Sequence, residues 1–220
     1  MSADFTHVDT WLFDLDNTLY PHDSGLTRQV DARMNEVVRA LTGLPAHEAD
    51  ALRARYLEEH GLTLRGLMLH HGVDPIVFNA MFHDIALETL ADDPALAAAI
   101  ARLPGRRLIF TNADDVHAER VTARLGLTGL FDDVFHIASA DFLPKPERAT
   151  FARLIAAHAI RPAATAFFDD RAMNLAPAAE LGMTTVLVGA GADANTDAFV
   201  THRAPRLADF LADARVKEPA

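Results

Sequence analysis

Short apolar runs alternate with single segments of helical length over most of this 220-residue chain, and this alternation restricts the possible folds more than any other feature. The strand-like runs lie at Thr10–Asp14, Arg107–Phe110, Val134–Ala138, Ala164–Phe168 and Thr184–Val188. The helical segments between the last four runs are Asp115–Leu125, Glu147–His158 and Ala172–Leu181. Because a strand, a helix and a strand in succession make a parallel crossover unit, the pattern predicts an α/β fold with a doubly wound parallel sheet.

The alternation is interrupted once, between the first strand-like run and the second. Residues 21–90 contain no good strand run. Their clearest helical patterns lie at Val30–Leu41, Glu48–His60 and Pro75–Leu87. Residues 93–103 then have the pattern of a helix that returns to the sheet. We therefore expect a core domain formed by residues 1–20 and 91–220, and an all-helical cap domain, residues 21–90, inserted after the first strand.

Composition argues against several classes of function. The formal net charge of −11 disfavours a nucleic-acid polymer as partner, because a phosphate backbone requires a basic surface. A small phosphate ester is compatible with this charge, since one metal ion and one lysine can reverse the local field. The chain has no cysteine, so disulfides, thiolate metal sites and cysteine nucleophiles are ruled out. Without a signal-peptide pattern or an apolar stretch of about 20 residues, we expect a cytoplasmic protein with no membrane partner.

Two acids follow the first strand-like run. Asp14 and Asp16 stand two positions apart where a buried parallel strand should end. Ligand sites in open α/β sheets lie at the carboxyl ends of the strands, and paired carboxylates there favour a hard cation such as Mg²⁺. The alternative is a polar loop in which Asp16 or Asn17 shapes a turn.

Polar residues also follow the next two runs. Thr111 and Asn112 precede a helix, where a hydroxyl and free backbone N–H groups can bind an anion or where Thr111 can simply cap the helix. Lys145 lies between Pro144 and Pro146, whose rigid backbone fixes the direction of the ammonium and suits it to a phosphoryl oxygen. The alternative for Lys145 is a solvated loop lysine.

A second acid pair, Asp169 and Asp170, follows the fourth run and precedes a helix. Adjacent carboxylates at a strand end are costly unless a metal or a base neutralises them, although a turn or helix cap is the plainer explanation. Each of the four polar segments has such an explanation by itself. Because a doubly wound sheet gathers strand ends on one rim, their shared position predicts a single site.

The order of these motifs resembles the signature of a known family. The four motifs are Asp14-x-Asp16-x-Thr18, Thr111-Asn112, Lys145-Pro146 and Asp169-Asp170. Together they are similar to the four motifs of the haloacid dehalogenase-like hydrolases, which have a Rossmann-like core. The resemblance covers the chain almost from end to end, including a helical cap after the first motif.

The resemblance implies a Mg²⁺-dependent phosphomonoester hydrolase that works through an aspartyl-phosphate. Asp14 would attack phosphorus, and Asp16 would protonate the leaving oxygen and later activate water. Mg²⁺ would bind the Asp14 carboxylate, the Asp16 backbone carbonyl and Asp170, with Asp169 near or in the shell. The groups that would bind the phosphoryl group are Thr111, the Asn112 backbone and Lys145. Asp16 favours a phosphatase, because dehalogenase members lack an acid at that position.

Two residues depart from the family pattern. Arg171 stands where relatives often have serine, and it would either reach the substrate phosphate or pair with surface acids. Asn174 stands where many have aspartate, and an asparagine can still orient a lysine or a metal-bound water. We expect activity to survive both changes.

Three segments resemble most closely the pyrimidine 5′-nucleotidase branch of the family. These segments are Asp16–Pro21, Tyr56–Leu67 and Phe167–Leu175. The resemblance implies that the partner is a small phosphomonoester, a nucleoside monophosphate, with the cap contacting the leaving group. Cap residues that could recognise base or ribose are His22, Arg65, His70, His71 and Phe78. The plainer interpretation is that the paired histidines cap a helix and that Phe78 belongs to the core.

Other functions are also compatible with these motifs. Within the enzymes, the alternatives are a phosphatase for a small sugar phosphate or phosphoglycolate, a broad-specificity phosphatase and, less favoured, a hexose-phosphate mutase. Outside them, a phospho-acceptor signalling module would be shorter and would lack the helical insertion. A catalytically silent, partner-binding relative would be expected to have lost Asp14, Asp16 or Lys145, and all three are present. Nothing in the sequence indicates the oligomeric state.

Overall fold

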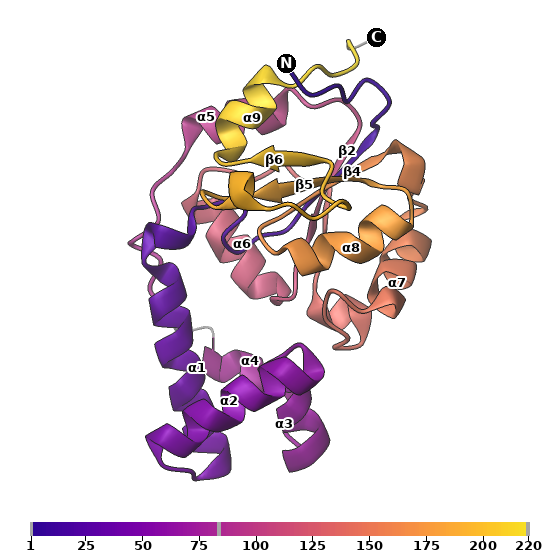
Figure 1. Ribbon diagram of the computed structural model, residues 1–220. Coiled ribbons are helices and arrows are strands. Elements are labelled where there is room, and N and C mark those ends of the chain that lie inside the picture. Colours follow the sequence, from indigo (N-terminus) through magenta and orange to yellow (C-terminus); the bar gives the residue numbers. More distant parts are fainter. Residues whose placement is uncertain (1, 83–84, 219–220) are drawn as a thin grey trace.

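The computed structural model describes residues 2–82 and 85–218 and contains one sheet with helices on both faces and a group of helices beside it (Figure 1). The strands are β1 Thr10–Phe13, β2 Arg106–Phe110, β3 Asp133–Phe135, β4 Thr165–Asp169, β5 Thr184–Val188 and β6 His202–Ala204. In the described residues they form a six-stranded sheet in the order β3-β2-β1-β4-β5-β6, with every pair parallel. The predicted doubly wound α/β fold is therefore confirmed.

The helices divide into two groups along the chain. Between β1 and the return to the sheet lie α1 Leu26–Thr42, α2 Ala46–His60, α3 Thr63–His71 and α4 Pro75–Phe82. The helices of the α/β layer are α5 Pro94–Ala101, α6 Asp115–Arg124, α7 Arg148–His158, α8 Ala172–Glu180 and α9 Leu207–Asp213. Short 3-10 turns lie at His22–Ser24, Ile137–Ala140, Pro162–Ala164 and Ala192–Ala194.

Strand β1 is central, with β2 and β4 on its two sides, and its side chains alternate between two hydrophobic clusters. Trp11 and Phe13 are fully buried in the cluster that includes residues of α5, α6 and α9, whereas Leu12 is buried in the cluster of α7 and α8. Burying such side chains stabilises the fold by about 1.5–3 kcal/mol each. Because both faces and both edges of β1 are covered, the residue that follows it, Asp14, lies at the middle of the sheet rim.

Helices α1–α4 pack on one another around a hydrophobic cluster of their own, which includes Val38, Leu67 and Phe78. In Figure 1 this group lies beyond the carboxyl ends of the strands, and the chain enters it from the sheet through α1. On this basis we propose that residues 21–90 form a cap domain and that residues 1–20 and 91–220 form the core domain.

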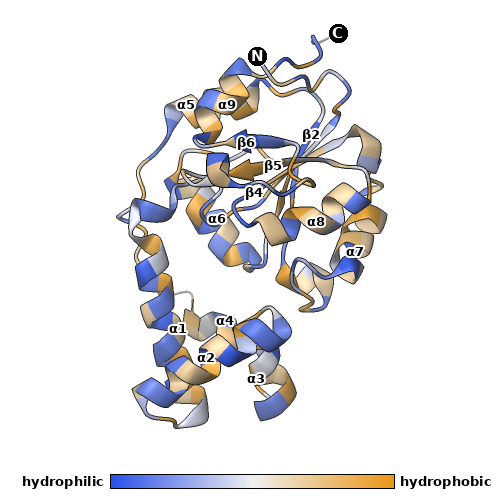
Figure 2. Cartoon of the chain, in the orientation of Figure 1, coloured by the Kyte–Doolittle hydropathy of each residue, from blue (hydrophilic) through white to orange (hydrophobic). Residues whose placement is uncertain are grey.

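Two elements were not predicted, and each has a physical reason. Helix α3 contains Gly66, which normally weakens a helix, but a Cβ atom at this position would lie 2.2 Å from Tyr56 Cγ, so the glycine permits α2 and α3 to pack closely. Strand β6 is short and pairs at the sheet edge, and Figure 2 shows it as largely hydrophilic beside the hydrophobic β5. Its sequence has no apolar pattern from which to predict a strand.

Two predicted elements extend too far. The run Val134–Ala138 forms β3 only to Phe135, because the Ile137 N–H donates to the Ala113 carbonyl and a 3-10 turn begins there. The helix predicted at Pro75–Leu87 ends at Phe82; residues 83–84 lie outside the described residues, and residues 85–87 are not helical. Among residues 2–82 and 85–218, no helix combines the length and the apolar content needed to cross a bilayer.

Candidate active site

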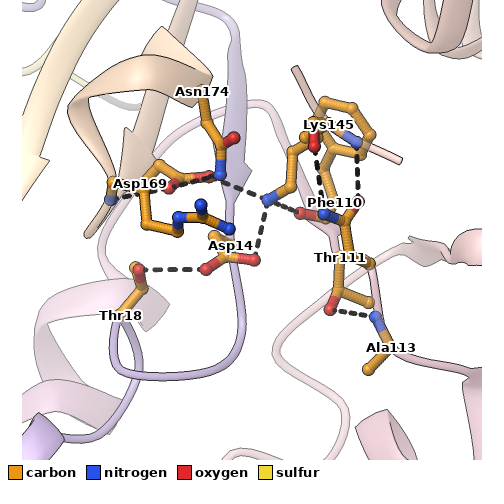
Figure 3. Close-up of polar contacts among 10 residues, drawn as sticks. Asp14, Thr18, Phe110, Thr111, Ala113, Lys145, Asp169 and Asn174 are labelled. Carbon is orange, nitrogen blue, oxygen red and sulfur yellow. Dashed lines mark hydrogen bonds and ion pairs between the residues drawn. The ribbon is translucent and has the colours of Figure 1, made fainter. Parts of the chain in front are cut away.

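The four predicted polar segments meet at one rim of the sheet. Asp14 follows β1 directly, and its N–H donates to the Phe168 carbonyl of β4 at 2.8 Å. Thr111 follows β2, and Asp169 ends β4. Lys145 comes from the loop before α7 and reaches the same place (Figure 3). The structure therefore brings together residues that are up to 155 positions apart in the sequence.

The Lys145 ammonium is at the centre of this cluster. Its Nζ donates to Asp14 Oδ1 at 2.7 Å, to Asp169 Oδ2 at 2.8 Å and to the Phe110 carbonyl oxygen at 2.7 Å. These three bonds use all three ammonium hydrogens. Burial alone would lower the pKa of Lys145, but the two carboxylates outweigh it and the pKa is raised. Lys145 is thus a fixed buried cation, and the solvated-loop alternative does not hold.

Asn112 holds the Lys145 backbone in place. Its Oδ1 accepts from the Lys145 N–H at 2.7 Å, and its Nδ2 donates to the Lys145 carbonyl at 3.3 Å. The Asn112 side chain is therefore engaged in positioning the lysine loop and is not directed to a substrate. Thr111 is buried, and its Oγ1 accepts from the Ala113 N–H at 3.0 Å, which leaves its hydroxyl hydrogen unused by this bond.

Three carboxylates lie close enough to share one cation. Single oxygens of Asp14, Asp169 and Asp170 all lie within 4.8 Å of one another. Burial raises the pKa of Asp14 well above its ordinary value, with Lys145 opposing the rise and the other two acids adding to it. Burial, followed by the proximity of Asp169, raises the pKa of Asp170 to about 6. A cation bound between these carboxylates would offset both the cost of burying their charge and the repulsion among them.

The donor set fits a hard divalent cation. Three carboxylates and the Lys145 ammonium leave a formal charge of −2 in a mostly buried site. The ligand atoms are all oxygen, which matches the preference of Mg²⁺. Asp16, predicted to contribute its backbone carbonyl, turns its carboxylate away from this cluster and toward two other residues.

The Asp16 carboxylate is held by a tyrosine and a histidine. Tyr20 Oη donates to Asp16 Oδ1 at 2.6 Å, and His117 Nε2 lies 2.8 Å from the same oxygen. Burial opposes ionisation of Asp16, but His117 outweighs it and the pKa of Asp16 is lowered. Burial likewise opposes protonation of His117, but the carboxylate outweighs it and the pKa of His117 is raised. The sequence analysis did not identify His117; its position one turn after Asn112, at the start of a helix on the same rim, was the available signal.

Asn174 and Arg171 occupy different positions at the site. Asn174 Nδ2 donates to both oxygens of Asp169, at 3.0 and 3.1 Å, and so orients the carboxylate that binds Lys145. Its own Oδ1 is buried without a hydrogen-bond partner among the described residues. Arg171 is exposed; its backbone N–H donates to Asp169 Oδ1 at 2.9 Å, and its guanidinium lowers the pKa of neighbouring Asp170, in opposition to the larger effect of burial.

A small cavity of about 80 Å³ separates the cap helices from this rim. Its polar lining includes Asp16, Asn112 and His117. Its apolar lining comes mainly from the cap, and it consists of Val30, Met34, Leu62, Leu64, Phe78, Phe82, Ala113 and Ile137. Phe78 is also part of the buried cap cluster, so it is at once a core residue, as the plainer interpretation expected, and a wall of the cavity that contains Asp16.

The other cap candidates are not in this cavity. Arg65 lies 3.6 Å from Glu147 in an ion pair between α3 and the start of α7. His70 stacks on Tyr56 and lies 3.0 Å from His60, and His71 bonds to the Tyr56 hydroxyl at 2.9 Å, at the end of α3. His22 lines a separate, open cavity of about 1070 Å³, whose wall also includes Thr18, Tyr20 and Asp170.

Comparisons with known proteins identify the family of the chain. A sequence model of the haloacid dehalogenase-like hydrolases matches residues 8–182 of the chain. The chain is 26% identical over 193 residues to Phosphate metabolism protein 8 of Saccharomyces cerevisiae, an alignment that covers 80% of this chain and 60% of that protein. The match therefore spans less than two thirds of the length of this relative.

Two solved structures are similar in fold. The HAD phosphatase from Thermococcus onnurineus has a TM-score of 0.62 at 16% identity, covering 98% of this chain and 100% of that chain. The L-2-haloacid dehalogenase from Xanthobacter autotrophicus has a TM-score of 0.58 at 17% identity, covering 93% of this chain and 97% of that chain. Since one is a phosphatase and the other a dehalogenase, the fold does not distinguish between these activities.

Proposed function

The chain belongs to the haloacid dehalogenase-like hydrolase family, and we propose that it is a Mg²⁺-dependent phosphomonoesterase with Asp14 as its nucleophile. The observation that carries the proposal is the buried Lys145 ammonium bonded to Asp14 and Asp169, with Asp170 completing a three-carboxylate cluster beside it. Phosphoryl transfer requires mainly positioning and charge neutralisation, and this cluster is built to supply both.

The residues that would hold Mg²⁺ are Asp14, Asp170 and the Asp16 backbone carbonyl, with Asp169 close to the shell. When bound, the cation would neutralise charge on the phosphoryl oxygens and orient phosphorus toward Asp14. The Lys145 ammonium, held beside the Asp14 carboxylate, would contribute a positive charge close to the same oxygens. The Thr111 hydroxyl and the Asn112 backbone at the end of β2 would bind a further phosphoryl oxygen.

The reaction takes place in two steps on the chain's own residues. The first step requires the protonated form of Asp16, although the pKa of Asp16 is lowered in the free protein. A carboxylate oxygen of Asp14 forms a bond to phosphorus, the ester P–O bond breaks, and Asp16 gives its proton to the leaving oxygen. In the second, Asp16, now a carboxylate, takes a proton from a water molecule that attacks phosphorus. The bond between Asp14 and phosphorus then breaks, and inorganic phosphate is released.

Asp16 favours a phosphatase over a dehalogenase. A halide leaves without a proton, so a dehalogenase has no use for an acid two residues after its nucleophile, whereas an alkoxide requires one. Here Asp16 is present and held by Tyr20 and His117, in the wall of the cavity that would receive a leaving group. The name of the yeast relative, which refers to phosphate metabolism, is consistent with this activity.

We propose nucleoside monophosphates, pyrimidine nucleotides first, as the substrate. The support is the resemblance of three segments to the pyrimidine 5′-nucleotidase branch, together with the aromatic walls that Phe78 and Phe82 contribute to the cavity beside Asp16. Phe78 replaces the histidines of α3 as the favoured contact to the base, because His70 bonds to His60 of α2 and His71 bonds to the Tyr56 hydroxyl.

A specific observation favours a second candidate, a phosphatase for a small sugar phosphate or phosphoglycolate. The cavity beside Asp16 has a volume of about 80 Å³. Sites for drug-sized ligands have volumes of roughly 300 Å³ or more, so a nucleoside would require the cap helices to move away from the rim. A leaving group of a few atoms fits the cavity without such a movement.

The test is a measurement of phosphate release from a panel of nucleoside monophosphates and small sugar phosphates, with Mg²⁺ or with EDTA. Asp14→Asn should abolish release, and Asp209→Asn, at an exposed site on α9, is the matched control that should leave it unchanged. Preference for UMP and CMP would support the nucleotidase, and preference for a sugar phosphate would support the second candidate. A folded wild-type protein that releases no phosphate from any ester would refute the phosphatase proposal.

A further inference from the structure

Two donors converge on a single oxygen of Asp16. Tyr20 Oη lies 2.6 Å from Asp16 Oδ1, and His117 Nε2 lies 2.8 Å from it. Both donors come from buried side chains, since Tyr20 is 4% exposed and His117 is 5% exposed. The Asp16 side chain itself is 36% exposed and faces the cavity between cap and core. The Asp16 carboxylate is therefore accessible to a ligand from the cavity, while two buried donors hold its Oδ1 in place.

The position of His117 is set by the same segment that ends β2. His117 lies in the first turn of α6, and its backbone N–H donates to Asp114 Oδ1, the N-cap side chain, at 2.8 Å. Thr111 and Asn112 directly precede this cap. The groups that would bind the phosphoryl group and the residue that holds Asp16 therefore come from one short segment, which the Asp114 cap stabilises.

Tyr20 approaches from the chain's own first motif, four residues after Asp16. The burial of Tyr20, together with the nearby Asp16 carboxylate, raises the pKa of its phenol, so Tyr20 keeps its hydroxyl hydrogen and donates it to Asp16. Two donors on Oδ1 occupy that oxygen, and Oδ2 accepts no hydrogen bond from the described residues. Oδ2 is thus the oxygen available to exchange a proton with a substrate.

We propose that His117, assisted by Tyr20, is a positioning residue that fixes the Asp16 carboxyl so that Oδ2 transfers the proton to the leaving oxygen. In this step the ester P–O bond breaks, its electron pair passes to the leaving oxygen, and the Oδ2 proton forms the new O–H bond. In the second step the same Oδ2 takes a proton from the attacking water. The inference rests on the proposed phosphatase activity and adds two residues to it.

The proposal predicts an effect that depends on the leaving group. An alcohol such as a nucleoside or glycerol needs a proton to leave, whereas 4-nitrophenolate leaves without one. Loss of a well-placed general acid typically lowers the rate about 10²–10⁴-fold. Misplacing Asp16 should therefore lower kcat for an alkyl phosphate by about 10²-fold, leave kcat for 4-nitrophenyl phosphate within about 3-fold, and change KM little.

The variants are chosen as a matched pair. His117→Gln keeps an N–H donor at about the position of Nε2, whereas His117→Met has a similar length and no donor. His117→Met should lower kcat for the alkyl phosphate but not for 4-nitrophenyl phosphate, and His117→Gln should retain most of the wild-type kcat for both. Tyr20→Phe alone should have a smaller effect, and together with His117→Met it should be more than additive, because either donor partly replaces the other. His158→Gln, which lies beside Arg106 on the far side of the core, is the control and should change neither substrate.

The outcomes separate the roles. An equal loss for both esters in His117→Met, with KM unchanged or raised, would assign His117 to general structure or to substrate binding and overturn the proposal. Full activity on both esters would overturn it as well. Thermal melting of each variant identifies any that fails to fold. If His117→Met does not fold, Tyr20→Phe then carries the test, since it removes the other donor to Asp16 Oδ1 and should show a smaller loss confined to the alkyl phosphate.

A second measurement does not depend on activity. The ¹⁵N NMR signals of the His117 ring report whether Nε2 carries a hydrogen and whether it is hydrogen-bonded. We expect a protonated, hydrogen-bonded Nε2 whose signal shifts in Asp16→Ala and stays unchanged in Asp115→Ala. If wild type hydrolyses no ester and the signal is present, the proposed function fails and the Asp16–His117 contact stands. If the signal does not respond to Asp16→Ala, the positioning role is refuted whatever the activity.

Discussion

Replacement of Lys145 by methionine tests the electrostatic centre of the site. The Lys145 Nζ lies 2.7 Å from Asp14 Oδ1 and 2.8 Å from Asp169 Oδ2, and the residue is 1% exposed. At an effective dielectric constant of about 20, each contact corresponds to a Coulomb attraction of about 6 kcal/mol before desolvation. Removing one partner of such a buried pair leaves uncompensated charge and typically costs about 3–5 kcal/mol. We expect Lys145→Met to lower the free energy of unfolding by this amount.

The assay is urea unfolding in EDTA, with wild type and variant compared at constant ionic strength. The chain has two lysines, so Lys217→Met, at an exposed position near the C-terminus, is the natural control and should change stability by less than about 0.5 kcal/mol. A loss below about 1 kcal/mol for Lys145→Met, or an equal loss in the control, would refute the electrostatic reasoning.

The loss of unfolding free energy in Lys145→Met should depend on pH and on Mg²⁺. The pKa of Asp14 is already raised in the folded protein, and loss of the ammonium raises it further. A carboxyl whose folded pKa is raised contributes stability below its unfolded pKa of about 4, and this contribution is lost as pH rises through the folded value. At about pH 4 the Asp14 carboxyl is mostly protonated and leaves little charge uncompensated, so the loss of unfolding free energy in Lys145→Met should be smaller there than at about pH 8. Mg²⁺ should reduce it at the higher pH, because it neutralises the same carboxylates.

Three further predictions concern the cap, the lysine loop and the metal. Gly66→Ala should destabilise the protein by about 1–3 kcal/mol in urea unfolding, because the new Cβ would lie 2.2 Å from Tyr56 Cγ, whereas Gly191→Ala, with no atom within 4 Å of its Cβ, should have little effect. Asn112→Ala removes the side chain that bonds to the Lys145 backbone, so it should lower kcat for phosphate release about 10-fold or more while the melting temperature changes by only a few degrees. An unchanged kcat would contradict the positioning role of Asn112. Mg²⁺ at about 100 times its Kd should raise the free energy of unfolding by about 2.7 kcal/mol in calorimetry, and no change in the presence of Mg²⁺ would contradict a metal site at the carboxylate cluster.

The fold could be predicted from the sequence wherever burial in the core leaves a run of apolar residues in a short segment. The run Thr10–Asp14 has three consecutive apolar residues, Trp11 to Phe13, because a central parallel strand is buried on both faces, and such a run marks the sheet directly. The edge strand β6 has no such pattern, since only part of it is covered. Helix α3 was not predicted either: the low helix propensity of Gly66 is outweighed by the close approach of α2 and α3 that it permits, which only the structure shows.

The site was predictable in its chemistry but not in its contacts. Acid, hydroxyl and lysine at successive strand ends indicated a shared rim, and the structure places Asp14, Lys145 and Asp169 within hydrogen-bonding distance there. The use of the Asn112 side chain to hold the lysine loop did not follow from its motif. His117 was not identified at all, because a single histidine in a helix has many ordinary roles.

The sheet class, the helical insertion after the first strand and the polar residues at the strand ends could be predicted from the sequence, because apolar runs and the polar residues that follow them are patterns of short segments. The partner of each polar atom could not be predicted in this way. The structure shows that Lys145 donates to three acceptors, that Asp16 bonds to Tyr20 and His117, and that the cavity beside Asp16 is small. These contacts join residues from separate strands and helices, and their distances follow from how the whole core and cap pack together. No spacing along the chain encodes them.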